Sequence, residues 1–138
     1  MLIALYLVLF GGGVGPAFNV ETFLAETKTA VVQIVEDVDR EQRVASVLVD
    51  LERSLADFRE QRVGTSKDIE TVDVNYASGP EDYMKVIREM EKAWLDFEFK
   101  VAESHTEVNK ALTEDEWEAL FDHLKDYRKG KNQVTGDR

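Results

Sequence analysis

The stretch that decides the fold runs from residue 80 to residue 110 and is PEDYMKVIREMEKAWLDFEFKVAESHTEVNK. Its apolar side chains recur at alternating steps of four and three residues, the heptad spacing of a helix that packs along a second helix. The positions with this spacing, called the aromatic seam below, are Tyr83, Ile87, Met90, Trp94, Phe97 and Val101, continued by His105 and Val108. The seam predicts a helix over about 80–110, begun by Pro80 and capped by Ser78 and Glu81.

We expect the partner helix upstream, over about 21–63. Apolar residues there also keep helical spacing, and neither Gly nor Pro interrupts the segment. Its weak place is the run AVVQIV at 30–35, whose β-branched residues would also suit a buried strand. A lone strand would leave its backbone groups unpaired, so the sequence favours a continuous helix. Gly64 is expected to end this helix, and 64–79 to form a polar loop.

A third, shorter helix is predicted over about 114–129. Thr113 and Glu116 have the spacing of a capping box, and the acidic residues after Thr113 suit a helix start. The apolar face of this segment carries Trp117, Leu120, Phe121 and Leu124.

The sequence therefore predicts an all-α fold, a long antiparallel helical hairpin plus a short third helix, in one domain over 21–129. The third helix either folds back over the hairpin to cap its core or runs alongside the first half of the first helix. Residues 130–138 are expected to form a basic polar tail.

Residues 1–20, MLIALYLVLFGGGVGPAFNV, contain no charged side chain. A short apolar run, then glycines and Pro16, then small residues, is typical of a secretory signal peptide. A retained helix of this length would span about 30 Å and serve as a membrane anchor, with Gly11 and Gly15 packing against another helix. An internal apolar segment of a cytosolic protein is a third alternative. The first two place the remaining chain in the periplasm or at the periplasmic face of the inner membrane.

Composition excludes several classes of function. The net charge of -11 argues against nucleic acid as a partner, because affinity for phosphates comes mainly from Lys and Arg. The chain has no cysteine, which excludes disulfides, thiolate metal sites and cysteine catalysis. Residues 125–138 carry a net charge of +3, so this tail is either solvated or rests on an anionic membrane surface.

The sequence predicts no enzyme and no cofactor. No serine lies in a nucleophile elbow, and no glycine-rich phosphate loop follows a strand. The weak candidates for metal ligands are His105, His123, Asp122 and Asp126. The two histidines fall on different predicted helices and the two aspartates flank His123 at helical reach, so a solvated helix face is the alternative.

One local motif resembles a known family. Leu112-Thr113-Glu114-Asp115-Glu116 opens the closing helix of a predicted hairpin, and it is similar to the Leu-Thr-x-x-Gln motif of small periplasmic helical proteins of the Spy and CpxP type. This chain has a single copy, with Glu116 where the family has glutamine. The resemblance implies an extracytoplasmic hairpin that shields unfolded or apolar partners.

Together these features predict a non-enzymatic cell-envelope protein that binds a protein partner or forms a homo-oligomer through the aromatic seam. The side chains expected to anchor the partner are Trp94, Phe97, Phe99, Trp117 and Phe121. A Spy-like periplasmic chaperone or stress protein, and an envelope metal or stress sensor, are the two alternative functions. Membrane association is expected through residues 1–20 and the basic tail.

Overall fold

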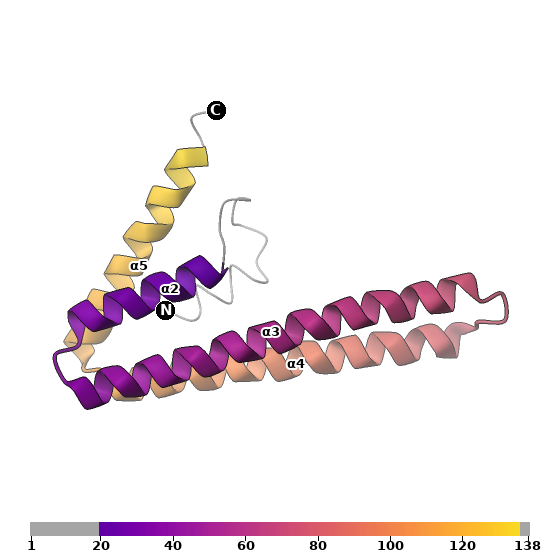
Figure 1. The fold of residues 1–138 in the computed structure, drawn as a ribbon, viewed down its shortest axis with the longest axis horizontal. Helices are drawn as coiled ribbons and strands as arrows, with labels where there is room; N and C mark the ends of the chain where they lie inside the picture. The colour runs from indigo at the N-terminus through magenta and orange to yellow at the C-terminus, as the bar shows by residue number, and fades with distance from the viewer. Residues whose placement is uncertain (1–19, 136–138) are drawn as a thin grey trace. The chain divides into compact units, whose positions relative to one another are not determined.

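The computed structural model describes residues 20–135, and their regular structure is entirely helical (Figure 1). The helices are α2 (Val20–Ile34), α3 (Val38–Val74), α4 (Pro80–Ala111) and α5 (Glu114–Thr135). The predicted all-α class is confirmed for this part of the chain. The predicted signal or anchor segment, with Gly11 and Gly15, lies outside the described residues. None of the helices within 20–135 combines the length and apolar character needed to cross a bilayer.

The predicted continuous helix over 21–63 is wrong, because the chain breaks at 35–37 between α2 and α3. Asp37 caps the second helix: its side-chain oxygen accepts the amide hydrogen of Arg40 (2.9 Å) and its carbonyl accepts that of Glu41 (2.9 Å). A β-branched run, which is a weak helix former, followed by a strong N-cap favours two helices over one. The alternative of a strand in that run is also wrong, since most of it lies in α2.

The predicted loop over 64–79 is also wrong, since only 75–79 separates α3 from α4. Gly64 lies inside α3, where a glycine costs roughly 0.5–1 kcal/mol relative to alanine and does not by itself stop a helix. The hydroxyl of Thr65, the next residue, donates a hydrogen bond to the carbonyl of Gln61 one turn earlier (2.9 Å). Asn75 ends the helix instead, because its side-chain oxygen accepts the amide hydrogen two residues on (3.0 Å) and starts a turn.

α4 begins at Pro80 as predicted, but its cap differs from the predicted pair Ser78 and Glu81. The amide of Gly79 donates to the carboxylate of Asp82 (2.8 Å). In a capping box a side chain three residues after the cap accepts the amide hydrogen of the cap residue, so this capping box lies one residue later than the predicted one. Asp82 rather than Glu81 makes the bond because Gly79, the residue before Pro80, occupies the cap position.

α5 begins at Glu114 with Thr113 as its N-cap, as predicted. It runs to Thr135 rather than ending near 129, so much of the segment expected to be a tail is helical. Within 130–135 only Lys131 and Gln133 are long straight-chain residues, which lose little side-chain freedom in a helix.

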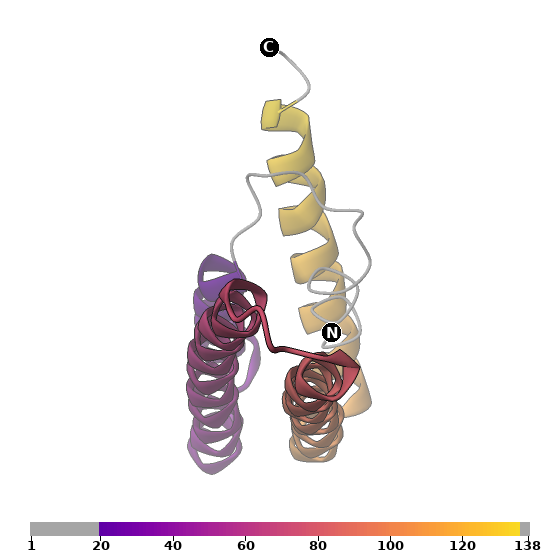
Figure 2. The same ribbon diagram turned by 90° about the vertical axis from the view of Figure 1, so that its right-hand side faces the viewer.

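The described chain divides into two compact units rather than the predicted single domain. Arg53–Lys100 forms one of them, called the hairpin unit here, and 20–52 with 101–135 forms the other, the four-helix unit. In the hairpin unit the second half of α3 and the first part of α4 are antiparallel arms joined by the short loop (Figure 2).

The four-helix unit holds most of the buried side chains. Here α5 packs against α2, which agrees with the predicted placement of the closing helix alongside the first half of the predicted first helix. Its core side chains are Phe23, Leu24, Ala30, Val31, Val35, Val44, Leu48, Leu51, Val101, Val108, Ala111, Leu112, Leu120 and Leu124.

Candidate functional site

In the hairpin unit the buried side of α4 is displaced from the aromatic seam, of which only Phe97 is buried there. The core-facing side chains are Val86 (6% exposed) and Phe97 (3%), whereas Tyr83 and Met90 remain 37% and 41% exposed. A stripe of four residues is thereby left half-exposed along one side of α4. This α4 stripe consists of Tyr83, Ile87, Met90 and Trp94. The seam continues as predicted into the four-helix unit, where Val108 is fully buried.

A small aromatic cluster holds one end of the stripe. Phe58 of α3 stacks on Phe97 with ring centroids 5.0 Å apart, and its ring meets Trp94 edge-on at 5.9 Å. The indole N–H of Trp94 donates to the Glu98 carboxylate (2.6 Å), so its polar atom is satisfied at the surface. Phe97 was expected to anchor a partner, and this expectation is wrong because its side chain belongs to the hairpin core.

The other end of the stripe lies near the loop between α3 and α4. There the hydroxyl of Tyr83 donates to the Asp73 carboxylate (2.8 Å), and this bond raises the pKa of Tyr83. Because a hydrogen bond orients each terminal aromatic ring, the stripe is ordered at both ends.

In the hairpin unit more large hydrophobic side chains are exposed than are buried. Only four large hydrophobic side chains are buried there: Leu55, Phe58, Val86 and Phe97. Eight others are exposed: Val63, Val74, Tyr76, Tyr83, Met84, Met90, Leu95 and Phe99. Leu95 (61% exposed) and Phe99 (71%) lie four residues apart and form a second, separate apolar pair on α4.

Two open hollows of about 270 and 330 Å³ lie between the arms of the hairpin unit. Gly64 and Ala93 contribute small side chains to the first hollow, and a Cβ atom on Gly64 would meet nothing within 4 Å. Asp68 and Glu89 line both hollows, and Lys85 and Lys92 line one each, so charges of both signs surround them. Their lining offers no buried convergent polar groups of the kind that orient a small molecule.

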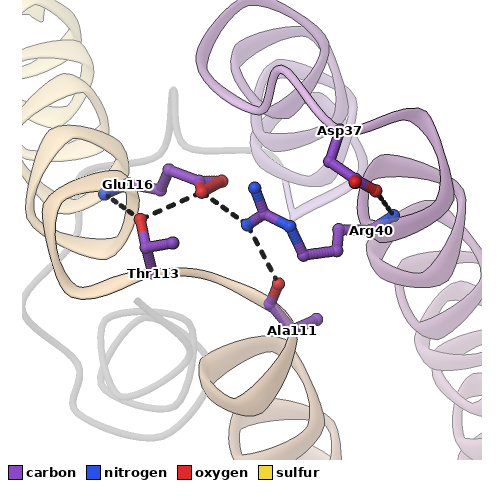
Figure 3. Close-up of polar contacts among 5 residues, drawn as sticks. All are labelled: Asp37, Arg40, Ala111, Thr113 and Glu116. Atoms are coloured by element: carbon purple, nitrogen blue, oxygen red, sulfur yellow. Dashed lines mark hydrogen bonds and ion pairs between the residues drawn. The ribbon is translucent and has the colours of Figure 1, made fainter.

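Polar contacts in the four-helix unit converge on Arg40 (Figure 3). Its guanidinium donates to the Glu116 carboxylate and to the carbonyl of Ala111 (3.4 Å). The hydroxyl of Thr113 accepts the amide hydrogen of Glu116 (3.2 Å) and donates to the same carboxylate (2.9 Å). We call this group the Arg40–Glu116 clamp, and it joins the start of α3 to the turn between α4 and α5.

Electrostatics keep the clamp charged. Burial alone would raise the pKa of Glu116, but the hydrogen bonds from Arg40 and Thr113 outweigh it and leave this pKa below its usual value. The hydrogen bond to Glu116 in turn raises the pKa of Arg40. The clamp is therefore a structural ion pair rather than a proton donor or acceptor near neutral pH.

The two histidines make separate contacts. His105 of α4 meets the ring of Trp117 edge-on at 5.1 Å, its Nδ1 is buried without a hydrogen-bond partner, and burial lowers its pKa. His123 of α5 pairs with Glu26 of α2 at 2.8 Å. In the part of the chain that the structure describes, no three His, Asp or Glu side chains gather closely enough to hold a metal ion. Asp122 and Asp126, the other candidate ligands, are exposed.

The two remaining predicted anchors, Trp117 and Phe121, both lie on α5. Trp117 is half-buried beside His105, and Phe121 is 46% exposed on α5, both within the four-helix unit. Val86 is a core residue that the predicted seam leaves out, although its place next to Ile87 indicates an apolar face too broad for one seam. Arg40 carries no signal in the sequence, because its partner Glu116 lies 76 residues away.

Comparisons with protein families, with curated proteins and with solved structures found no match to this chain.

Proposed function

We propose that this chain is a non-enzymatic helical protein of the cell envelope that binds a protein partner through the apolar surface of its hairpin unit. The observation that carries the proposal is the excess of exposed over buried large hydrophobic side chains in Arg53–Lys100. Several of these side chains line up along one side of α4 as the α4 stripe, and apolar side chains gathered in this way at a surface are typical of a contact with another protein.

The chemistry of that surface suits a protein partner. Aromatic residues and methionine are enriched at protein interfaces, and the α4 stripe supplies Tyr83, Met90 and Trp94. Its steps of four, three and four residues match those along which a second helix docks. The part of the proposal that concerns the envelope rests on the uncharged opening, residues 1–20.

A photoreactive amino acid placed at residue 90 in the chain's own cell tests the proposal. Met90 lies on the stripe, and Lys92, two residues on, is an exposed control on another side of the same helix. We expect a cross-linked product from position 90 and little or none from position 92. Equal products at both positions, or none at either, would contradict the proposal.

Fractionation of the same cells tests the compartment. A chain from which the signal peptide within residues 1–20 has been removed, found in the soluble envelope fraction, agrees with the envelope assignment, and so does an intact chain in the membrane. An intact chain recovered only from the cytosol refutes that assignment and leaves the contact surface to be judged by cross-linking.

A further inference from the structure

We infer that the C-terminal half of α5 lies on an anionic membrane surface, at the place where the uncharged residues 1–20 join the folded chain. This contact belongs to the four-helix unit. It therefore goes beyond the proposed function, which concerns the hairpin unit.

Basic residues gather on one side of this half of α5. Within 125–131 four residues are basic and one is acidic, although the whole chain has a net charge of -11. Because α5 runs through this stretch, positions 125, 128 and 129 have the spacing of one helix side. Lys125 and Lys129 are exposed, and Phe121, one turn before Lys125, is 46% exposed. Basic residues beside an exposed aromatic ring are typical of a helix that lies on an anionic membrane surface.

The packing of α5 on α2 brings these basic residues to the start of α2. The Arg40–Glu116 clamp holds the first turn of α5 near the chain that follows the end of α2. Farther along α5, His123 pairs with Glu26 near the start of α2 (2.8 Å), so the two helices run in opposite directions (Figure 1). Lys129 comes six residues after His123 and Val20 six before Glu26, so Lys129 and Val20 are about level at 1.5 Å per residue.

The start of α2 is where the uncharged segment joins the helices. Residues 1–20 contain no charged side chain, and their number is enough to enter a bilayer. A membrane at this end of the four-helix unit would meet the basic residues of α5 and the uncharged segment together. The acidic remainder of the chain does not oppose the contact strongly, because charges more than about 8 Å apart are largely screened at physiological salt. An acidic protein partner would account for the basic residues, but not for the uncharged segment beside them.

Quenching of fluorescence by brominated lipid tests the contact. Phe121→Trp places a reporter on α5 in a chain that also carries Trp94→Phe and Trp117→Phe, and the chain is mixed with vesicles that contain brominated phosphatidylcholine. We expect quenching when about one third of the lipid is phosphatidylglycerol, and far less when no anionic lipid is present. Salt at about 0.5 M should reverse most of the quenching, because it screens the charges.

Two paired variants make the test specific. Lys125→Gln with Lys129→Gln removes two charges from the basic side of α5. Each basic residue near an anionic surface contributes about fivefold in affinity, so the equilibrium constant of the contact should fall about 25-fold. Lys85→Gln with Lys92→Gln is the matched control, because it removes two charges from exposed positions on α4, and we expect a change of less than about threefold. Circular dichroism should confirm that both pairs fold, since all four side chains are exposed.

The outcomes decide between the membrane and its alternatives. Quenching that does not depend on anionic lipid, or that falls equally in the two paired variants, refutes the inference. Absence of quenching in every vesicle also refutes it. Self-association that Lys125→Gln with Lys129→Gln abolishes would then identify the acidic surface of a second copy as the partner. The proposed function is judged separately, by the cross-link from position 90.

Discussion

Replacing Phe58 by alanine should unfold the hairpin unit while leaving the four-helix unit folded. Phe58 is 7% exposed, stacks on Phe97 and meets Trp94 edge-on. It is one of only four large hydrophobic side chains buried in Arg53–Lys100. Few other contacts in this unit are available to replace those that the substitution removes.

The expected loss can be compared with the stability available. Truncating a buried Phe to Ala costs about 3–5 kcal/mol, which includes the transfer of the ring and the cavity it leaves. A unit of about 50 residues has roughly 2.5–7.5 kcal/mol of stability at the usual value per residue. Phe58→Ala should therefore remove most of the stability of the hairpin unit. Phe58→Leu keeps most of the volume and loses two ring contacts, so we expect about 1–2 kcal/mol.

The two tryptophans allow each unit to be followed separately. Trp94 lies in the hairpin unit and Trp117 in the four-helix unit, so Trp117→Phe and Trp94→Phe each leave one fluorescent reporter. In urea, Phe58→Ala should shift the Trp94 transition to much lower concentration and leave the Trp117 transition in place. Hydrogen exchange of the hairpin amides should accelerate at least about 100-fold, since each 1.4 kcal/mol is a factor of ten.

Two results would refute this reasoning. If both fluorescence transitions moved together by the same amount, the described chain would unfold as one cooperative unit. If Phe58→Ala cost less than about 1 kcal/mol, the small core of the hairpin unit would not be what holds its arms together.

Four further substitutions test the four-helix unit. Leu120→Ala should lower the free energy of unfolding by about 2–5 kcal/mol in a urea titration, because Leu120 is fully buried, whereas Phe121→Ala beside it, 46% exposed, should cost about 1 kcal/mol or less. Glu116→Gln should be less stable than the wild-type chain at pH 7. The difference in melting temperature should shrink as the pH falls below 4.5, because a carboxyl group whose pKa is lowered by folding loses its stabilising effect when it is protonated. The wild-type chain should lose stability below pH 6.5, because the pKa of His105 is lowered in the folded chain and protonation of His105 therefore opposes folding. His105→Phe should not show this loss. Melting temperatures of both proteins at pH 7.5 and 5.5 measure the difference.

The sequence predicted the helical class, the span of α4 and the start of α5 because those features depend on local patterns. The Thr113 cap and the Pro80 helix start are each a short run of residues whose preferences agree. The breaks in the first half were placed wrongly for the same reason. Gly64 predicted a helix end, although the residues on both sides of it favour a helix. Asp37 caps a helix within a run that otherwise keeps helical spacing, so the spacing gives no sign of the break.

The contact surface could be predicted only in part. Heptad spacing identified the apolar side of α4, but the spacing alone does not fix which edge of a broad apolar face turns toward α3. Val86 and Phe97 define that direction through contacts with α3, and such contacts follow from tertiary packing. The partners of Arg40 and His123 lie 76 and 97 residues away, so neither pair leaves a periodic signal in the sequence.

The α4 stripe is exposed because α3 offers it no apolar cover. Between Val63 and Val72, Ile69 is the only aliphatic side chain. Phe58 of α3 lies level with Phe97 of α4, because their rings stack. The two helices are antiparallel, so Ser66, eight residues after Phe58, lies level with residue 89, eight residues before Phe97. Residue 89 is next to Met90.

Ser66→Leu should therefore cover part of the stripe from within the hairpin unit. Burying one leucine against Met90 should stabilise this unit by about 1 kcal/mol beyond Ser66→Ala, which shares the gain in helix propensity but lacks the covering side chain. The midpoint of the Trp94 transition in urea measures the difference between the two variants. The leucine variant should also give less cross-linked product from position 90, because the partner would have to displace the new side chain. If the two variants were equally stable and cross-linked equally, α3 would not be the element whose polar surface leaves the stripe exposed, and the apolar excess of α4 would need another explanation.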